Sequence, residues 1–378
     1  KALPSLDTEV LVALRLGAYQ LLFLQRVPGR AAIHESVELV KTARVKSAAG
    51  FVNAVLRKVA PSDLEKKQRA LDIQTAHGLS LRYSHPEWLV ERWLKRFGLE
   101  KVAQLLEHNN RLPGVYFRIN SPDITHEDLS AILEGQSVRF KAHALSGDVF
   151  ELMEGNLYET ALYLDHRITI QDAGSQLIPR LLDLRPSDLC LDLCAGAGGK
   201  SSQMARLKDS ASPVVATDLH WHRLRVARSL HSRHWKSLLW VACDATHPLP
   251  FLNQFDKILV DAPCSGTGTL QRHPEIRWRL KPEQIREITL LQVSLLENAF
   301  RCLRPAGLLV YSTCSLELEE NEGVVQTFLN AHADARLVIP EGALTQPWFS
   351  QTQFLNLFPP ETRTDGFFAA VIRKTDSN

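Results

Sequence analysis

Residues 189–200 read Leu189-Cys-Leu-Asp-Leu-Cys-Ala-Gly-Ala-Gly-Gly-Lys200, an apolar run that leads into a glycine-rich loop. The run predicts a buried strand, and its three glycines let the backbone turn tightly and approach a ligand closely. The stretch therefore predicts a strand, a loop and the first turn of a helix, as in doubly wound α/β folds. Its spacing is neither that of a strict G-x-G-x-x-G motif nor that of a Walker loop, so by itself it does not identify the ligand.

The chain beyond this stretch alternates between strand-like and helix-like segments. Short apolar runs are separated by longer stretches with helical periodicity, including 282–301 and 319–332. Such alternation predicts a Rossmann-like α/β domain with a mostly parallel sheet. The predicted strands lie at 189–193, 213–217, 238–242, 257–260, 308–312 and 367–372.

Four successive predicted strands each end in an aspartate: Asp192, Asp218, Asp244 and Asp261. Ligands of open α/β sheets bind at this carboxyl edge, and an acid about 20 residues past the glycine loop, here Asp218, accepts hydrogen bonds from ribose hydroxyls. Asp244 is placed to reach the exocyclic amine of an adenine. Because acids attract a cationic sulfonium and repel a pyrophosphate, the set favours S-adenosylmethionine over NAD as the cofactor.

Two cysteines follow the ends of neighbouring predicted strands. Cys264 lies in Asp261-Ala-Pro-Cys-Ser-Gly-Thr-Gly268, and Cys314 lies in Ser312-Thr-Cys-Ser315. The loops after adjacent parallel strands meet at one edge of the sheet, so we expect both thiols in one cleft. The alternative is that both are small buried apolar residues, which is the commonest fate of a free cysteine.

A thiol in such a cleft suits methylation of C5 of cytosine. C5 is too weak a nucleophile to take a methyl group directly, but addition of a thiolate to C6 makes C5 enamine-like. A nearby carboxylic acid that protonates N3 would assist the addition, and a base must remove the C5 proton afterwards. Since a free thiol has a pKa of about 8.5, the site must favour the thiolate.

The cysteine and histidine pattern predicts no metal site. The chain has six cysteines without a C-x-x-C pair, and no second ligand pair accompanies Cys190 and Cys194. The histidines between His220 and His234 would spread around a helix. We therefore expect no metal ion, no disulfide framework and a location in the reducing cytoplasm. No apolar run approaches the roughly 20 residues of a membrane helix, so no membrane association is expected.

The first 170 residues have a different pattern. Residues 1–60 carry apolar residues at helical spacing in three segments, which predicts a small helical domain. Residues 61–80 are polar and weakly patterned, and we interpret them as a linker. Residues 84–109 predict a further helix, and 114–165 predict a small α+β unit.

These motifs resemble those of the RsmB/NOP family of RNA cytosine-C5 methyltransferases, which includes RsmB (also called Sun or Fmu) and the NOL/NOP/NSUN proteins. The resemblance covers roughly residues 84–374, and the paired cysteine motifs are its most specific part. It rests on Asp192-Leu-Cys-Ala-Gly-Ala-Gly-Gly-Lys200, Asp261-Ala-Pro-Cys-Ser-Gly-Thr-Gly268, Tyr311-Ser-Thr-Cys-Ser315, Thr364-Asp-Gly-Phe-Phe368, Phe117-Arg-Ile-Asn120 and Gln171-Asp-Ala-Gly-Ser-Gln176.

The resemblance implies catalytic roles for three residues. Cys314 is similar to the nucleophile that adds to C6, Cys264 to the second thiol that assists product release, and Asp261 to the acid that contacts the base and the cofactor. Lys200 is implied to help at the target base as well. The cofactor-binding residues that it implies are Cys194, Ala195, Gly196, Ala197, Gly198, Gly199, Lys200, Asp218, Asp244 and Asp261.

One departure from the family pattern lies in the cofactor loop. The family usually has Ala-Pro where this chain has Gly196-Ala197. Because a proline restricts the backbone, its replacement is expected to loosen the loop and to weaken cofactor binding. No reacting group is lost, so the expected activity is unchanged.

The N-terminal segment narrows the resemblance. Gly17-Ala-Tyr-Gln-Leu-Leu-Phe23 and Gly50-Phe-Val-Asn-Ala-Val-Leu-Arg57 resemble the helical NusB-like RNA-binding domain of RsmB-type proteins. The implied substrate and partner is 16S ribosomal RNA. The domains expected are 1–65 (NusB-like, beginning partway through), 66–83 (a linker), 84–170 (a helical and small α+β RNA-binding subdomain) and 171–378 (the S-adenosylmethionine-dependent methyltransferase domain).

Three alternatives stay open. One is the same chemistry on transfer RNA or at another ribosomal site. A second is a non-catalytic assembly factor of the NusB type, which the intact Cys264 and Cys314 disfavour, and a third is a dehydrogenase, which the strand-end acids disfavour. We expect a monomer.

The net charge of +2 does not by itself indicate nucleic-acid binding. Basic clusters, each interpreted first as a solvated helix face, lie at Lys41, Arg44 and Lys46, at Arg223, Arg225, Arg228 and Arg233, and at Arg272, Arg277 and Arg279.

Overall fold

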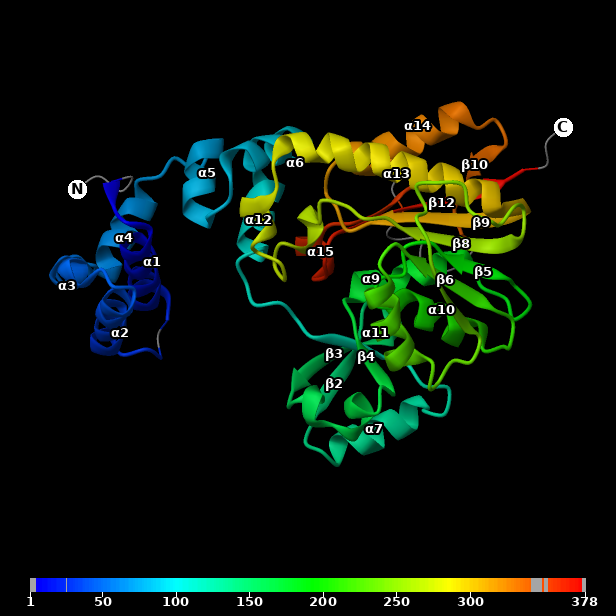
Figure 1. The fold of residues 1–378 in the computed structure, drawn as a ribbon, viewed down its shortest axis with the longest axis horizontal. Helices are drawn as coiled ribbons and strands as arrows, with labels where there is room; N and C mark the ends of the chain where they lie inside the picture. The colour runs from blue at the N-terminus through cyan, green and yellow to red at the C-terminus, as the bar shows by residue number, and fades with distance from the viewer. Residues whose placement is uncertain (1–4, 25, 341–348, 350–352, 376–378) are drawn as a thin grey trace. The chain divides into compact units, whose positions relative to one another are not determined.

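The structure is a computed structural model that describes residues 5–24, 26–340, 349 and 353–375. It consists of two compact units, Lys1–Glu91 (the N-terminal unit) and Arg92–Asn378 (the C-terminal unit). Figure 1 shows the helices and strands of both units. The predicted catalytic and cofactor-binding residues all lie in the C-terminal unit.

The N-terminal unit is helical, as its apolar spacing predicts. Gly17 lets its helices approach closely, because a Cβ there would lie 2.5 Å from a methyl carbon of Leu56 and 2.6 Å from the hydroxyl of Ser36. Val10, Val40 and Val52 belong to its buried core. Its first helices are α1 (Thr8–Phe23), α2 (Gly29–Thr42) and α3 (Ala49–Leu56).

The segment 66–83, predicted to be a linker, is largely helical. It contains the end of α4 (Pro61–Arg69) and all of α5 (Ala76–Tyr83). The hydroxyl of Thr75 accepts a hydrogen bond from the Gly78 backbone at the start of α5, and Leu79 is buried. Helices this short do not display a clear apolar period, so the sequence pattern does not reveal them.

The C-terminal unit begins with most of α6 (Glu87–His108), which is interrupted at Gly98 (φ 78°), and continues with an antiparallel sheet. Helix α7 (His126–Glu134) packs on this sheet and starts with a capping box of Thr125 and Asp128. The α+β prediction is therefore confirmed. The strand order is β2 (Arg139–His143), β3 (Ser146–Glu154), β1 (Tyr116–Ile119) and β4 (Ile168–Ile170).

A larger sheet forms the rest of this unit. Neighbouring strands among β7, β6, β5, β8 and β9 are parallel, whereas β12 is antiparallel to β9, so the predicted mostly parallel sheet is confirmed. The described strands, in order, are β10 (Ala335–Leu337), β12 (Phe367–Lys374), β9 (Leu303–Thr313), β8 (Phe255–Asp261), β5 (Cys190–Asp192), β6 (Val214–Asp218) and β7 (Leu238–Ala242), with β11 (Leu355–Leu357) paired to β12.

Side chains alternate between two cores along the parallel strands. Leu191 and Leu309 pack in the core that contains residues of α13 (Pro282–Cys302) and α14 (Val324–Ala331). Cys190 and Val310 pack in the core on the opposite face, with residues of α9 (Ala173–Leu177) and α10 (Gly199–Lys208). Figure 1 shows these helices on the two faces of the sheet. The strands therefore read as continuous apolar runs, because both of their faces are buried.

The helix predicted at 319–332 is interrupted. Residues Glu319–Gly323 form one π-helical turn, and the α-helix α14 follows it. The predicted strand 308–312 is longer, since β9 begins at Leu303. Strands β10 and β11 are three residues long and pair at the β12 edge, and no apolar run in the sequence marks them.

The connection order places the candidate site. The chain runs through β5, β6 and β7 in one direction across the sheet, and then returns to add β8 on the other side of β5. A reversal of this kind is where ligands bind in open α/β sheets, at the carboxyl ends of the strands. The loops that carry Gly196, Cys264 and Cys314 leave the sheet at this edge.

Candidate active site

The glycine loop connects β5 to α10. Gly196 (φ 56°) and Gly198 (φ 79°) both adopt backbone conformations that favour glycine. A Cβ on Gly198 would lie 2.8 Å from the indole of Trp240, whereas one on Gly196 would meet nothing within 4 Å. His231 holds the loop through Nε2, which is 3.2 Å from the carbonyl oxygen of Ala197. The loop therefore packs tightly on one side and borders open space on the other.

Three of the four predicted acids are the last residues of their strands. Asp192 is fully buried and accepts a hydrogen bond from the Ser201 hydroxyl at 2.6 Å, and its burial raises the pKa of its carboxyl to about 7. Asp218 accepts a hydrogen bond from the Gly196 backbone at 3.0 Å. Asp192 therefore binds the first turn of α10, while Asp218 binds the loop backbone directly.

Asp244 is placed differently from the prediction. Strand β7 ends at Ala242, so Asp244 lies two residues beyond the strand. It is exposed and accepts a hydrogen bond from the Thr246 backbone at 3.0 Å, and these bonds with Thr246 lower the pKa of its carboxyl. The residue thus caps a turn at the rim of the sheet edge, where a solvent-facing carboxylate can still meet a ligand.

The residues at this edge fit S-adenosylmethionine. The open space beside Gly196 admits a ligand against the loop backbone. Asp218 and Asp261 bring negative charge and acceptor oxygens, which suit ribose hydroxyls and a sulfonium cation. The nearest ammonium group, that of Lys200, is paired with Asp261 at 2.6 Å and does not form a phosphate site.

The two predicted thiols lie side by side. The Sγ atoms of Cys264 and Cys314 are 3.3 Å apart, and both side chains are partly accessible. The Gly268 backbone donates a hydrogen bond to the Cys314 carbonyl at 2.9 Å, so the two loops are joined by main chain as well. A Cβ on Gly268 would lie 2.5 Å from the Gly366 carbonyl oxygen, so glycine here allows the 364–368 segment to close on the site.

A partly buried ion pair accompanies the thiols. The Lys200 ammonium lies 2.6 Å from Oδ2 of Asp261, whose Oδ1 accepts a hydrogen bond from Ser312 at 2.9 Å. Burial disfavours the charged form of Lys200, but attraction to Asp261 and then to Cys314 outweighs it and raises the pKa of the ammonium. The hydrogen bond to Cys314, followed by burial, raises the pKa of the Cys264 thiol well above its usual value. The raised pKa favours the protonated form of Cys264.

Glu320, which the sequence analysis does not identify, holds both cysteine loops. Its carboxylate accepts hydrogen bonds from the Ser265 backbone at 2.8 Å, the Ser315 hydroxyl at 2.5 Å and the Gln292 amide at 3.1 Å, and from the Ser265 hydroxyl. Burial raises the pKa of this carboxyl. No signal in the sequence separates Glu320 from its neighbour Glu319, which pairs with Arg92 at 2.7 Å instead.

The basic clusters separate into exposed and buried members. Arg272 lies 3.1 Å from Asp172 and 3.2 Å from Asp365, and Arg277 is buried, so both belong to the interior and not to a surface patch. The remaining basic residues of the three clusters are exposed: Lys41, Arg44, Lys46, Arg223, Arg225, Arg228, Arg233 and Arg279.

The described residues contain no group of three or more His, Cys, Asp or Glu side chains that could hold a metal ion. Within 5–24, 26–340, 349 and 353–375, no helix has the length and apolar character required to cross a membrane.

Three family models match the chain. The model described as 16S rRNA methyltransferase RsmB/F matches residues 179–373. A model of the NusB family matches residues 1–61, and a model of an RsmF/B-like ferredoxin-like domain matches residues 85–157. Together these matches reach both units of the structure.

Individual proteins are similar over most of the chain. The probable ribosomal RNA small subunit methyltransferase B of Bacillus subtilis is 32% identical, and the match covers 97% of this chain and 83% of the relative. The ribosomal RNA small subunit methyltransferase B of Vibrio cholerae is 34% identical over 95% of this chain and 80% of the relative. A solved methyltransferase homologue from Pyrococcus horikoshii is 32% identical, with a TM-score of 0.67 over 78% of this chain and 97% of that chain.

Proposed function

Because the chain belongs to the family of 16S rRNA methyltransferases RsmB/F, we propose that it methylates C5 of a specific cytosine in 16S ribosomal RNA through a bond between Cys314 and C6. The family accounts for S-adenosylmethionine-dependent methylation of ribosomal RNA. The observation that carries the cytosine-C5 proposal is the 3.3 Å separation of the Cys264 and Cys314 sulfurs beside the Lys200–Asp261 pair. A ring nitrogen or a ribose hydroxyl has its own lone pair and requires no thiol nucleophile, whereas C5 does.

The first half of the proposed reaction activates the base. The Cys314 thiolate forms a bond to C6, and the electron pair of the C5–C6 double bond moves to C5. Lys200, held by Asp261, donates a hydrogen bond to the base as negative charge builds on it. We assign the donor of this hydrogen bond to Lys200 and not to Asp261, because the ion pair keeps the lysine protonated. S-adenosylmethionine, when bound, supplies an electrophilic methyl group to C5.

The second half releases the product. The C5 proton leaves to a base, its electron pair re-forms the C5–C6 double bond, and the bond from C6 to sulfur breaks. Cys314 then leaves as a thiolate. The protonated Cys264 lies 3.3 Å from this sulfur and stabilises it by donating a hydrogen bond. This division of roles requires two thiols in different protonation states.

The residues that we assign to the cofactor surround the carboxyl end of β5.

The target base must leave its stack to reach the thiols, so single-stranded RNA is the expected substrate form and duplex a poor one. We also assign RNA binding to 1–65 and 84–170 and methyl transfer to 171–378. The assigned cofactor contacts are Cys194, Ala195, Gly196, Ala197, Gly198, Gly199, Lys200, Asp218, Asp244 and Asp261.

The two thiol roles have opposite mutant phenotypes. Cys314→Ala should abolish methyl transfer because no adduct forms, and Cys264→Ala should accumulate enzyme covalently attached to RNA because release fails. Denaturing gels with end-labelled RNA and S-adenosylmethionine separate the two results. Cys302→Ala, a buried thiol in the α13 core, is the matched control and should methylate normally. Normal methylation by Cys314→Ala would falsify the assignment.

The position of the methyl group has its own test. Bisulfite sequencing of 16S ribosomal RNA from cells with and without the gene should show one protected cytosine that depends on the gene. A methylated RNA in which every cytosine is still converted would contradict the C5 proposal, even if the enzyme remains an RNA methyltransferase.

A further inference from the structure

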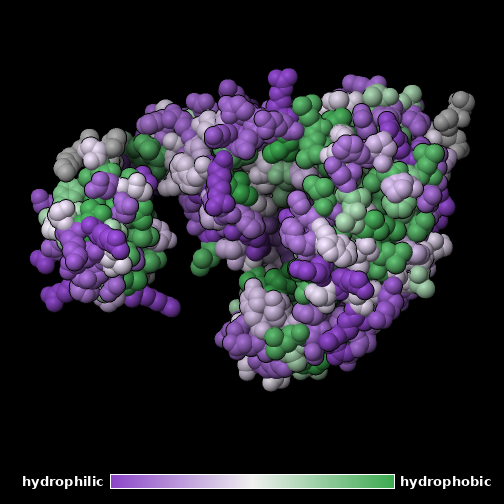
Figure 2. Space-filling model, in the orientation of Figure 1, coloured by the Kyte–Doolittle hydropathy of each residue, from purple (hydrophilic) through white to green (hydrophobic). Residues whose placement is uncertain are grey.

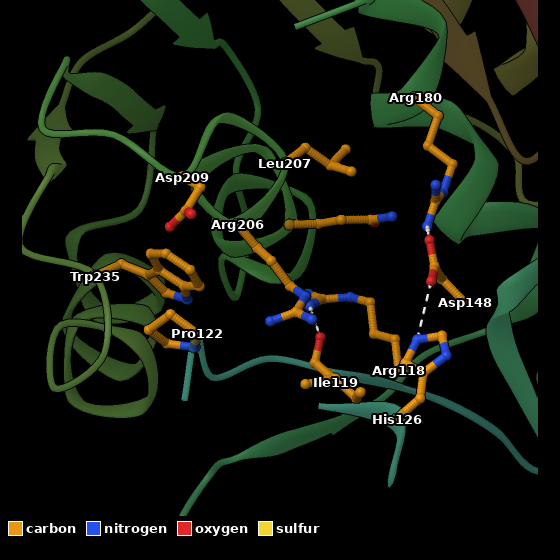
Figure 3. Close-up of a pocket in the computed structure, with 11 residues that line it drawn as sticks. Arg118, Ile119, Pro122, His126, Asp148, Arg180, Arg206, Leu207, Asp209 and Trp235 are labelled. Atoms are coloured by element: carbon orange, nitrogen blue, oxygen red, sulfur yellow. Dashed lines mark hydrogen bonds and ion pairs between the residues drawn. The ribbon is translucent and has the colours of Figure 1, made fainter. Parts of the chain in front are cut away.

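A polar hollow of about 300 Å³ lies between the small antiparallel sheet and helix α10. Figure 3 shows the side chains that line it, which come from both parts of the C-terminal unit. Arg118 enters from β1, Arg180 from the turn that follows α9, and Arg206 from α10. None of these residues belongs to the thiol site, and the proposed reaction does not use them.

The charges in the hollow are not balanced. Its lining contains three arginines and two aspartates, Asp148 and Asp209. Asp148 is occupied, because it lies 2.7 Å from Arg180 and 3.0 Å from His126, as the dashed lines in Figure 3 mark. Among the described residues, no carboxylate lies within 4.0 Å of either Arg118 or Arg206.

Burial and repulsion from the neighbouring arginines destabilise the charged form of Arg118. Arg118 is only 3% exposed, and burial together with the neighbouring Arg206 and Arg180 lowers the pKa of its guanidinium to about 9. Burial also lowers the pKa of Arg206. Buried charges in proteins are usually paired, and Arg118 is a buried charge without a carboxylate partner among the described residues, so an anion supplied from outside would be stabilised in this hollow.

The same unit offers an internal comparison. Arg272 is also largely buried, and it lies 3.1 Å from Asp172 and 3.2 Å from Asp365. Arg272 is therefore matched by two carboxylates. Arg206 instead donates one hydrogen bond to the Ser121 carbonyl, and the described residues present no acceptor to its other nitrogens.

Unused donors point to an oxyanion. Arg206 lines the hollow and has N–H groups without an acceptor among the described residues. Arg180 lines it as well and pairs with Asp148 through one nitrogen, so two planar guanidinium groups border the same hollow, the arrangement that recognises phosphate. Arg118 serves as a fixed positive charge beneath them, since its nitrogens donate to neutral groups such as Gln171 and the Gly199 carbonyl.

The surroundings favour an RNA strand over a free ion. Trp235 lines both this hollow and a second groove of about 360 Å³ along α11 (Trp221–His231) and β7. Residues 219–243 contain no Asp or Glu. Trp221 is 51% exposed at this groove, and exposed indoles beside cations suit stacked bases. Figure 2 shows a mostly hydrophilic surface where α11 is drawn in Figure 1. The basic residues of 219–243 are Arg223, Arg225, Arg228, Arg233 and Lys236.

We propose that Arg206 and Arg180 bind a phosphodiester group of single-stranded RNA in this hollow. The strand then continues along the Trp221 groove. The inference rests on the proposed function in that it takes RNA as the substrate. It adds a second contact outside the thiol site, which anchors the strand while the target cytosine enters the cleft.

The test measures RNA affinity, not activity. Fluorescence anisotropy of a labelled single-stranded oligoribonucleotide gives Kd at several salt concentrations for wild type, Arg206→Gln and Arg301→Gln. Arg301 is an exposed arginine on α13 with the same charge, so it is the matched control. Arg206→Gln should weaken binding about tenfold and reduce the slope of log K against log salt by about 0.7, the value for one phosphate on a single strand. Arg301→Gln should change neither quantity.

Further variants and ligands distinguish an RNA phosphate from a free phosphate ion. They also distinguish failure of this proposal from failure of the proposed function. Arg206→Lys keeps the charge and should retain the salt slope. If inorganic phosphate raises the melting temperature of wild type but not of Arg206→Gln, while RNA affinity is the same in both, the site takes a free anion and the RNA proposal is overturned. Equal losses in Arg206→Gln and Arg301→Gln would overturn it too. A wild type that binds no RNA would refute the proposed function itself.

Discussion

The buried carboxylate of Glu320 holds together the two loops that carry Cys264 and Cys314. It accepts hydrogen bonds from the residues that directly follow Cys264 and Cys314, and thereby ties together two loops 50 residues apart in the chain. A glutamate that is left without partners in the interior is costly, but this one has four donors around it. The distance between the thiols therefore depends on a residue that touches neither the base nor the cofactor.

Glu320→Gln places an amide among groups that donate hydrogen bonds. We expect it to lower the free energy of unfolding by about 1–3 kcal/mol, since at least one buried donor loses its acceptor. Methyl transfer should slow as the two loops separate. Urea unfolding and single-turnover methylation measure the two effects. Glu319→Gln removes the exposed neighbouring carboxylate and should cost less than about 1 kcal/mol; equal losses in both variants would argue against the assigned role.

At the scale of the element, α11 supports the cofactor loop through His231. Nε2 of His231 lies 3.2 Å from the Ala197 carbonyl, and Nδ1 is buried with no hydrogen-bond partner in the described structure. Burial, with the charge of Arg118, lowers the pKa of the imidazole to about 4. A second proton would create a buried, unpartnered N–H group, so this histidine supports the loop only in its neutral form.

The pKa of His231 predicts a loss of stability in acid. The unfolded chain takes up the proton near pH 6.5 and the folded one only near pH 4, so stability is complete above pH 6.5 and falls as the pH drops toward 4. The contribution lost is about 2 kcal/mol at pH 5. Urea unfolding of wild type and His231→Gln at pH 7 and pH 5 should show the smaller loss in the variant.

The comparison with a variant isolates the histidine. Asp192 has a raised pKa, which gives an opposite slope between about pH 4 and pH 7, but it is present in both proteins and cancels in the difference. His222→Gln changes an exposed histidine of the same helix and should follow wild type. If the wild-type and His231→Gln stabilities stay parallel from pH 7 to pH 5, the buried imidazole is not responsible.

At the scale of the whole molecule, Arg272 joins distant parts of the C-terminal unit. It contacts Asp172 before α9, Asp365 before β12 and the Gly114 carbonyl before β1. Burial, followed by repulsion from Asp172, raises the pKa of Asp365 to about 7 even beside this cation. Two carboxylates therefore depend on one guanidinium for their compensation.

Arg272→Gln leaves these carboxylates without a cation. We expect the free energy of unfolding at pH 8 to fall by about 3–5 kcal/mol, the usual cost of breaking a buried ion pair by removing one partner. Because the carboxylates can take up protons, the loss should shrink as the pH is lowered to 5. Arg279→Gln, from the exposed end of the same cluster, should change stability by less than about 0.5 kcal/mol. Equal stability of the two variants would restore the surface interpretation of Arg272.

Sequence patterns predict those helices and strands whose own residues carry a signal, such as an apolar run or a helical period. The strands β5, β6, β8, β9 and β12 were predictable because burial on two faces produces continuous apolar runs, and α13 because a long helix shows its period. Strand β7 also has an apolar run, although most of it is only partly buried. The helices α4 and α5, the strands β10 and β11 and the π-helical turn at Glu319 carry no such signal. The strands β10 and β11 depend on pairing with β12, which is distant from them in the chain.

The features of the candidate site also divide into those that the sequence predicts and those that only the structure reveals. The sequence by itself predicted that Cys264 and Cys314 follow consecutive strands of one parallel sheet and hence lie at the same edge, because parallel strands end at one edge. The tertiary structure decided that these two strands, β8 and β9, are neighbours. Only the tertiary structure decided that Lys200 pairs with Asp261, that Glu320 clamps both loops and that Arg272 is internal while Arg206 lies unmatched in a hollow. The physical reason is that charge states depend on burial and on groups a few ångströms away, and the order of residues along the chain does not specify which groups those are.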